Sequence, residues 1–138
     1  MAYLWNSILE TGNKEIDEQH KQLFIALNDL NDAYWQGKGS DEVSGILDFL
    51  KEYTINHFKD EEIIMRDYKY PQYSMHRMCH EDFKITVEDF SRQLRKEGPS
   101  EELIVKLTTT LGDWLTTHIR IDDARMAEFI ESNGYVDI

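Results

Sequence analysis

The histidines are the residues of this sequence whose types and spacing could do chemistry. The chain holds five of them: His20, His57, His76, His80 and His118. His57 stands four residues before Glu61, and His76 stands four residues before His80. On an α-helix, side chains four residues apart project from the same face, one turn from each other. Imidazole and carboxylate groups paired in this way are suitable ligands for a metal ion.

Each histidine falls on the apolar stripe of a segment with helical periodicity, and Glu61 falls there too. A single inward histidine is more often a hydrogen-bonded core residue than a ligand, and an inward glutamate can pair with a lysine or arginine. That alternative would have to hold for all five histidines, on four helices. We therefore expect a metal centre rather than a purely structural bundle.

The number of candidate ligands favours two metal ions. Five imidazoles and at least one carboxylate are too many for one zinc, which takes about four ligands. The zinc-protease pattern His-Glu-x-x-His is absent, because its last position after His80-Glu81 holds Lys84. Calcium and magnesium prefer oxygen ligands, whereas imidazole with carboxylate suits iron, copper, zinc or nickel. We expect the carboxylates to bridge the two metals.

The elements that must position these residues are four long helices. Breaks at Gly37-Lys38-Gly39-Ser40, Tyr70-Pro71-Gln72 and Gly98-Pro99-Ser100 divide the chain. We predict helices over about 17–36, 41–68, 73–96 and 100–132, preceded by an N-terminal arm over about 1–16, with Asp41 and Ser100 as N-caps. The prediction is an all-α fold: one domain over 1–138, an up-down-up-down antiparallel four-helix bundle.

Composition and charge exclude several classes of protein. The net charge of −12 opposes binding to nucleic acid or to an anionic membrane surface. No apolar run approaches the roughly 20 residues that cross a bilayer, and the N-terminus lacks the features of a secretory signal. The single cysteine, Cys79, cannot form an internal disulfide, and we expect a small packed side chain there. The expected location is the cytoplasm.

Four segments resemble the hemerythrin family, and its single-domain bacterial members in particular. They are Ile16-Asp17-Glu18-Gln19-His20-Lys21, His57-Phe58-x-x-Glu61-Glu62, His76-x-x-x-His80 and Trp114-Leu115-x-x-His118-Ile119-x-x-x-Asp123. The similarity extends from about Trp5 to Ile130. It implies a non-haem di-iron site, with an oxo or hydroxo group as a further bridge between the irons.

The resemblance also implies a role for each ligand. One iron would be held by His76, His80 and His118, and the other by His20 and His57, with Glu61 and Asp123 bridging both. One position then stays open on the iron with two histidines, where an external ligand can bind. The implied function is reversible dioxygen binding for transport, storage or scavenging, without enzymatic turnover.

Helix geometry and the family pattern disagree about which aspartate faces inward. Asp122 lies four residues after His118 and would share its face on a regular helix, whereas Asp123 lies about 140° away. With Asp123 inward, the inward set also contains Met126, Ala127 and Ile130. This set is more apolar than the regular-helix alternative of Asp122, Arg125 and Phe129. We therefore predict a π-bulge between His118 and Asp123, a frequent device at functional sites.

Apolar residues next to the ligands are candidates for an oxygen pocket, although ordinary core packing would explain each of them equally well. They are Leu115, Leu23, Phe24, Phe58 and Ile119, with Leu115 as the expected wall over the open position. Many family members carry an aromatic residue where this chain has Met126, which predicts faster autoxidation. Glu62, Asp17 and Glu81 are candidates to accept from the second nitrogen of a ligand histidine.

Other functions are compatible with the same site. A ferritin-like oxidase or peroxidase would carry Glu-x-x-His motifs, and the nearest match here is Asp17-x-x-His20. Sensing of oxygen, redox state or nitric oxide, and iron handling, are further alternatives. Because the sequence ends at Ile138 without an output domain, we expect a carrier, store or scavenger. The sequence predicts no particular protein partner.

Overall fold

The structure, a computed structural model, describes residues 9–132 and is all-helical in that range. Helix α1 covers Lys14–Trp35, α2 covers Ser40–Asp67 and α3 covers Tyr73–Glu97. The fourth long helix has three parts: α4 over Glu101–His118, the π-helix η2 over Ile119–Asp123, and α5 over Ala124–Ser132. None of the helices within 9–132 has both the length and the apolarity that a bilayer span requires.

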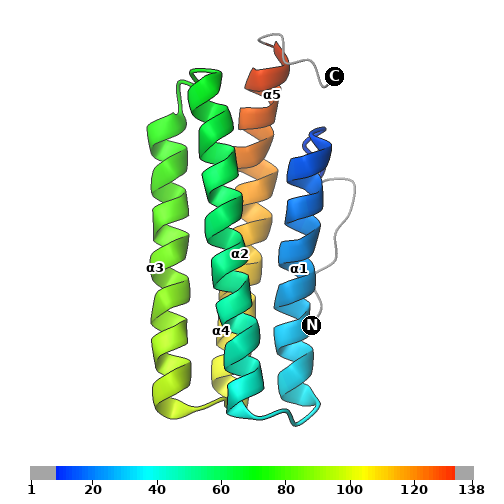
Figure 1. Cartoon of the computed structure of the whole chain (residues 1–138), viewed down its shortest axis with the longest axis vertical. Coiled ribbons are helices and arrows are strands. Elements are labelled where there is room, and N and C mark those ends of the chain that lie inside the picture. The colour runs from blue at the N-terminus through cyan, green and yellow to red at the C-terminus, as the bar shows by residue number, and fades with distance from the viewer. Residues whose placement is uncertain (1–8, 133–138) are drawn as a thin grey trace.

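The four long helices alternate in direction, which confirms the predicted up-down-up-down bundle (Figure 1). Helix α1 packs against α2 and α4, and α3 packs against the same two helices. Each helix therefore turns one face toward the centre of the bundle. The turn after α3 depends on Gly98, whose φ of 76° is costly for residues with a side chain.

Two apolar clusters fill the interior, one on each side of the histidines. The larger cluster includes Leu23 and Phe58, and it extends toward the α1–α2 and α3–α4 turns. The smaller cluster contains Ile16, Met65, Tyr70, Met126 and Ile130. On α1, His20 lies between Ile16 of the smaller cluster and Leu23 of the larger one. The polar centre is thus a belt enclosed by apolar side chains above and below.

Helix caps explain where the observed helices begin. Ser100 caps α4 as predicted, since its hydroxyl accepts from the Leu103 N–H at 3.1 Å. The prediction of Asp41 as the N-cap of α2 was wrong, because α2 begins at Ser40 with Gly39 in the cap position. Asp41 lies in the first turn instead, where its negative charge interacts favourably with the positive end of the helix dipole.

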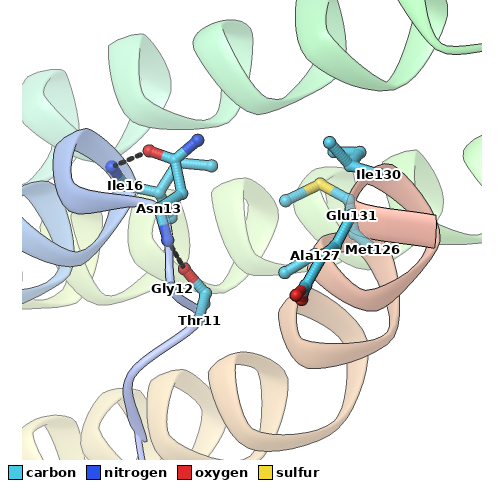
Figure 2. Close-up of a pocket in the computed structure, with 8 residues that line it drawn as sticks. All are labelled: Thr11, Gly12, Asn13, Ile16, Met126, Ala127, Ile130 and Glu131. Carbon is cyan, nitrogen blue, oxygen red and sulfur yellow. Dashed lines mark hydrogen bonds between the residues drawn. The ribbon is translucent and has the colours of Figure 1, made fainter. Parts of the chain in front are cut away.

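Helix α1 begins three residues earlier than predicted. Asn13 caps it by accepting a hydrogen bond from the Ile16 N–H at 3.1 Å, a contact shown in Figure 2. Residues 14–16, which we expected in the arm, are therefore helical. Residues 1–8 of the predicted arm lie outside the described residues.

Candidate metal centre

The bundle brings together all seven side chains that the sequence singled out as candidate ligands. Helix α1 supplies His20, α2 supplies His57 and Glu61, α3 supplies His76 and His80, α4 supplies His118 and η2 supplies Asp123. Every one of them is buried, and both carboxylates are 0% exposed. A cluster of this polarity in a bundle core is costly unless its charges are matched.

The ligand atoms fall into two groups that share both carboxylates. One group contains Glu61, His76, His80, His118 and Asp123, and the other contains His20, His57, Glu61 and Asp123. Within each group the candidate ligand atoms all lie within 4.8 Å of one another. Each group is therefore compact enough to surround one metal ion.

Glu61 directs one oxygen toward each group. Its Oε2 lies 2.8 Å from His57 Nε2 and 3.2 Å from His20 Nε2. Its Oε1 lies 3.1 Å from His80 Nε2 and 3.4 Å from His76 Nε2. This is the arrangement that a carboxylate needs in order to bridge two ions.

Asp123 is divided between the groups in the same way. Its Oδ2 lies 3.0 Å from His20 Nε2, whereas its Oδ1 lies 3.0 Å from His76 Nε2 and 3.3 Å from His118 Nε2. The two carboxylates thus approach both groups from different helices.

The π-helix is what places Asp123 inward, and the predicted distortion is confirmed. Five residues, Ile119–Asp123, form the π-turn between α4 and α5. Both aspartates then reach the same imidazole: Asp122 Oδ2 lies 2.9 Å from His118 Nδ1, and Asp123 Oδ1 approaches Nε2. Met126 and Ile130 face the core, as the shifted register requires.

Opposite charges in the belt shift the pKa values strongly. Burial alone would raise the pKa of Glu61, but His57 and the neighbouring histidines outweigh it and hold that pKa well below its usual range. Burial and the charge of Glu61 would likewise raise the pKa of Asp123, yet the histidines lower it. Both carboxylates are therefore ionised and demand positive charge beside them.

Three of the histidines have pKa values shifted in the opposite direction. Burial would lower the pKa of His20 and of His76, but contacts with Asp123 and Glu61 raise both to about 9. The pKa of His118 is also raised well above its usual value, because Asp123, Asp122 and Glu61 together outweigh burial. Without a metal, these imidazoles hold protons in the place of the positive charge that an ion would supply.

The outer nitrogens of three histidines have oxygen partners. Besides Asp122 on His118, Glu62 Oε2 lies 2.9 Å from His80 Nδ1, as one of our candidates predicted. Gln19 Oε1 lies 2.6 Å from His57 Nδ1, and sequence reasoning missed this contact.

The two other candidate partners are engaged elsewhere. Asp17 accepts hydrogen bonds from the Thr11 N–H and hydroxyl, at 2.8 Å each. Glu81 accepts from Lys84 Nζ at 3.1 Å, on the exposed side of α3. Which acidic residue contacts the outer nitrogen of a histidine therefore depends on the helix face on which that acidic residue lies.

These contacts test whether metal ions fit the site. When the imidazole is neutral, an Nδ1–H that donates to a carboxylate or amide oxygen leaves a lone pair on Nε2, and each such Nε2 points into the belt. Neither Asp123 oxygen makes a hydrogen bond within the described residues, although both are fully buried. Lone pairs facing carboxylate oxygens repel each other unless a cation lies between them. The donor set therefore fits two metal ions.

The candidate oxygen-pocket residues all lie in the larger apolar cluster: Leu23, Phe24, Phe58, Leu115 and Ile119. Phe58 stacks on His80 with ring centroids 3.8 Å apart and planes at 6°. Trp114 stacks on His118 at 4.5 Å. Aromatic rings thus restrict two of the candidate ligands on the side that faces this cluster.

Cys79 lies just outside the belt. Its thiol is within 4.8 Å of ligand atoms of His118 and Asp122, and the side chain is half-buried. Burial raises the pKa of the Cys79 thiol, which keeps it protonated.

The chain also has a cavity of about 240 Å³ between the start of α1 and the end of α5 (Figure 2). Eight residues line it: Thr11, Gly12, Asn13, Ile16, Met126, Ala127, Ile130 and Glu131. None of the seven candidate ligands is among them. Ile16, Met126 and Ile130 belong to the smaller apolar cluster.

Fold and site together define a four-helix bundle with a histidine- and carboxylate-rich centre suited to two metal ions. The family model for the hemerythrin HHE cation binding domain matches residues 11–130. A bacteriohemerythrin of Pseudomonas aeruginosa is 36% identical over 99% of this chain and 82% of its own length. The chain belongs to the hemerythrin family.

Two further comparisons agree with this assignment. A myohemerythrin of Theromyzon tessulatum is 30% identical over 88% of this chain and 88% of its own length. The crystal structure of a mutant protein superposes with a TM-score of 0.82 at 26% identity, covering 94% of this chain and 98% of that one.

Proposed function

We propose that this chain holds two iron ions and binds dioxygen reversibly at them, as a carrier, store or scavenger. The observation that carries the proposal is the division of the belt into two ligand groups sharing Glu61 and Asp123. His76, His80 and His118 would hold one iron, and His20 and His57 the other. Two bound ferrous ions would supply the two electrons that dioxygen takes on binding and returns on release.

The protein's own part is to hold the ligands and to keep water out. Glu62, Asp122 and Gln19 fix three imidazoles with Nε2 inward, so the ligands need little rearrangement when a metal enters. The two-histidine group has fewer ligands than the other, which leaves room there for an external molecule.

The apolar surroundings favour reversible binding over oxidation of a substrate. Leu115 and Ile119 flank His118 along the fourth helix and are each 1% exposed. Residues of this kind exclude the water and protons that would displace a charged bound species. We assign Leu23, Phe24, Phe58, Leu115 and Ile119 to the lining of the oxygen pocket.

The test is a visible spectrum recorded through cycles of oxygenation. Iron-loaded protein is reduced without air, exposed to oxygen and then flushed with nitrogen. We expect a charge-transfer band that appears with oxygen and disappears when oxygen is removed, over several cycles. A band that forms once and cannot be reversed would instead indicate an oxidase or a sensor.

A further inference from the structure

The outer nitrogens of the candidate ligands differ in the charge of their partners. His80 and His118, which belong to the three-histidine group, contact the carboxylates of Glu62 and Asp122 at 2.9 Å each. His57, which belongs to the two-histidine group, contacts the neutral amide of Gln19. The two groups therefore share their bridging carboxylates but differ in what lies behind their imidazoles.

The orientation of the Gln19 amide is fixed by a second contact. Its Nε2 donates to Asp60 Oδ2 at 3.0 Å, so its carbonyl oxygen is the atom that faces His57 and accepts from Nδ1–H at 2.6 Å. The Gln19 side chain therefore lies between the negative charge of Asp60 and the imidazole of His57.

The carboxylates behind His80 and His118 are close and partly shielded from water. The side chain of Glu62 is 14% exposed and that of Asp122 is 33% exposed. Arg77 Nε lies 4.0 Å from Glu62 on an exposed side chain, and this weak pair leaves most of the Glu62 charge uncompensated.

A carboxylate that accepts from Nδ1–H draws the proton toward itself and makes Nε2 a stronger electron donor. A neutral amide draws the proton less strongly, so that Nε2 is a weaker electron donor. Stronger donation and nearby negative charge both stabilise the higher oxidation state of a bound metal.

We propose that Glu62 and Asp122 make the iron held by His80 and His118 harder to reduce than the iron held by His57, whose partner is Gln19. The inference rests on the proposed function, since it requires iron in both groups. Glu62, Asp122 and Gln19 act as positioning residues that also set the redox difference between the two ions. The easily reduced iron is then the one with room for an external ligand.

The test uses Glu62→Gln and Asp122→Asn, which keep a hydrogen-bond acceptor but remove the charge. Redox titrations of iron-loaded protein are followed by Mössbauer spectroscopy, which distinguishes the two irons. Each substitution is expected to raise the potential of the three-histidine iron, by on the order of tenfold in its ferric-to-ferrous equilibrium. The other iron is expected to change less.

The converse variant moves charge behind His57 without altering the net charge. Gln19→Glu combined with Asp60→Asn lets the new amide donate to the new carboxylate, and it is expected to lower the potential of the two-histidine iron. Glu81→Gln is the matched control, because it removes a charge next to His80 in sequence while Glu81 contacts Lys84 instead. It is expected to leave both potentials near wild type.

Iron content and circular dichroism of every variant separate this inference from the proposed function. Wild-type protein that does not load two irons would overturn the proposed function itself. The redox inference alone would be overturned if wild type loads two irons but the potentials are unchanged in all of the variants. These are Glu62→Gln, Asp122→Asn and the double variant Gln19→Glu with Asp60→Asn. Equal shifts in Glu81→Gln would also overturn it, since they would show a general charge effect.

Discussion

Glu61 and Asp123 are the residues on which both halves of the centre depend. Each is fully buried, each is ionised, and each turns one oxygen toward each group of histidines. Two negative charges in the core of a bundle are stable only if positive charge lies beside them. Protonated imidazoles supply it without metal, and two cations would supply it in the loaded protein.

Protons and metals therefore compete for the same imidazoles. His20 and His76 have pKa values of about 9 in the metal-free chain, so below that pH a metal must displace a proton from each. The apparent metal affinity is expected to rise with pH up to about 9, by about tenfold per pH unit for each proton displaced. Above that pH, His20 and His76 are expected to contribute no further increase in affinity.

This dependence is measured by competition with a chelator, under nitrogen, between pH 7 and 10. Since metal binding is favoured as the histidines lose protons, affinity must increase with pH. An affinity that is constant or decreases over this interval would contradict the assignment of these histidines as ligands.

At the scale of single residues, the candidate ligands were predictable from the sequence, but only some of the residues that contact them were. The histidines and Glu61 were detectable because polar residues on an apolar helical stripe need an explanation. Gln19 was not, since it lies 38 residues from His57 in sequence, and an amide can serve as donor or acceptor. Only the packing of α1 on α2 brings the two together.

Among the elements, the π-helix determines which aspartate of the fourth helix faces the belt. A π-turn acts as one extra residue in an α-helix, and here it lets Asp122 and Asp123 contact opposite nitrogens of His118. It also restores the inward register of Met126 and Ile130 further along the helix.

Deletion of Ile121 tests this view of the element. The deletion would convert the π-turn to a regular α-turn with Asp123 four residues after His118, so that it still faces inward. We expect the variant to fold and to retain two metal ions. Metal analysis and circular dichroism of the purified variant provide the measurement.

Deletion of Thr110, an exposed residue in the regular part of α4, is the matched control. It rotates everything that follows by about 100° relative to the preceding turns. This variant is expected to lose both its metals and its cooperative unfolding. If the two deletions behave alike, the π-turn is not a one-residue insertion in the sense proposed.

Helix ends were predictable where the sequence has a strong helix-breaking motif. Gly98-Pro99-Ser100 marks the end of α3 and the cap of α4, and the structure agrees there. The start of α1 was predicted too late, because the cap by Asn13 precedes any apolar periodicity. Asp41 was chosen as a cap on residue type alone, although Ser40 already belongs to the helix.

At the scale of the whole molecule, the polar belt weakens a core that is otherwise apolar. The clusters on either side contain none of the candidate ligands. We therefore expect the metal-free protein to keep its helices but to be less stable than the loaded form. An ion present at 100 times its dissociation constant adds about 2.7 kcal/mol to the free energy of unfolding.

Thermal unfolding followed by circular dichroism measures this difference. The midpoint is expected to rise on addition of iron and to rise further as the free iron concentration increases. The helical signal at low temperature is expected to be similar with and without metal. Equal midpoints in the two forms would mean that the belt does not bind the ions that the account requires.

The most direct test of the central claim is a crystal structure of iron-loaded protein with data collected at the iron absorption edge. We expect two anomalous peaks in the belt, each beside one oxygen of Glu61 and one oxygen of Asp123. The first peak should also contact His76, His80 and His118, and the second His20 and His57. A single peak, or peaks outside these residues, would contradict the assignment of a shared two-iron centre.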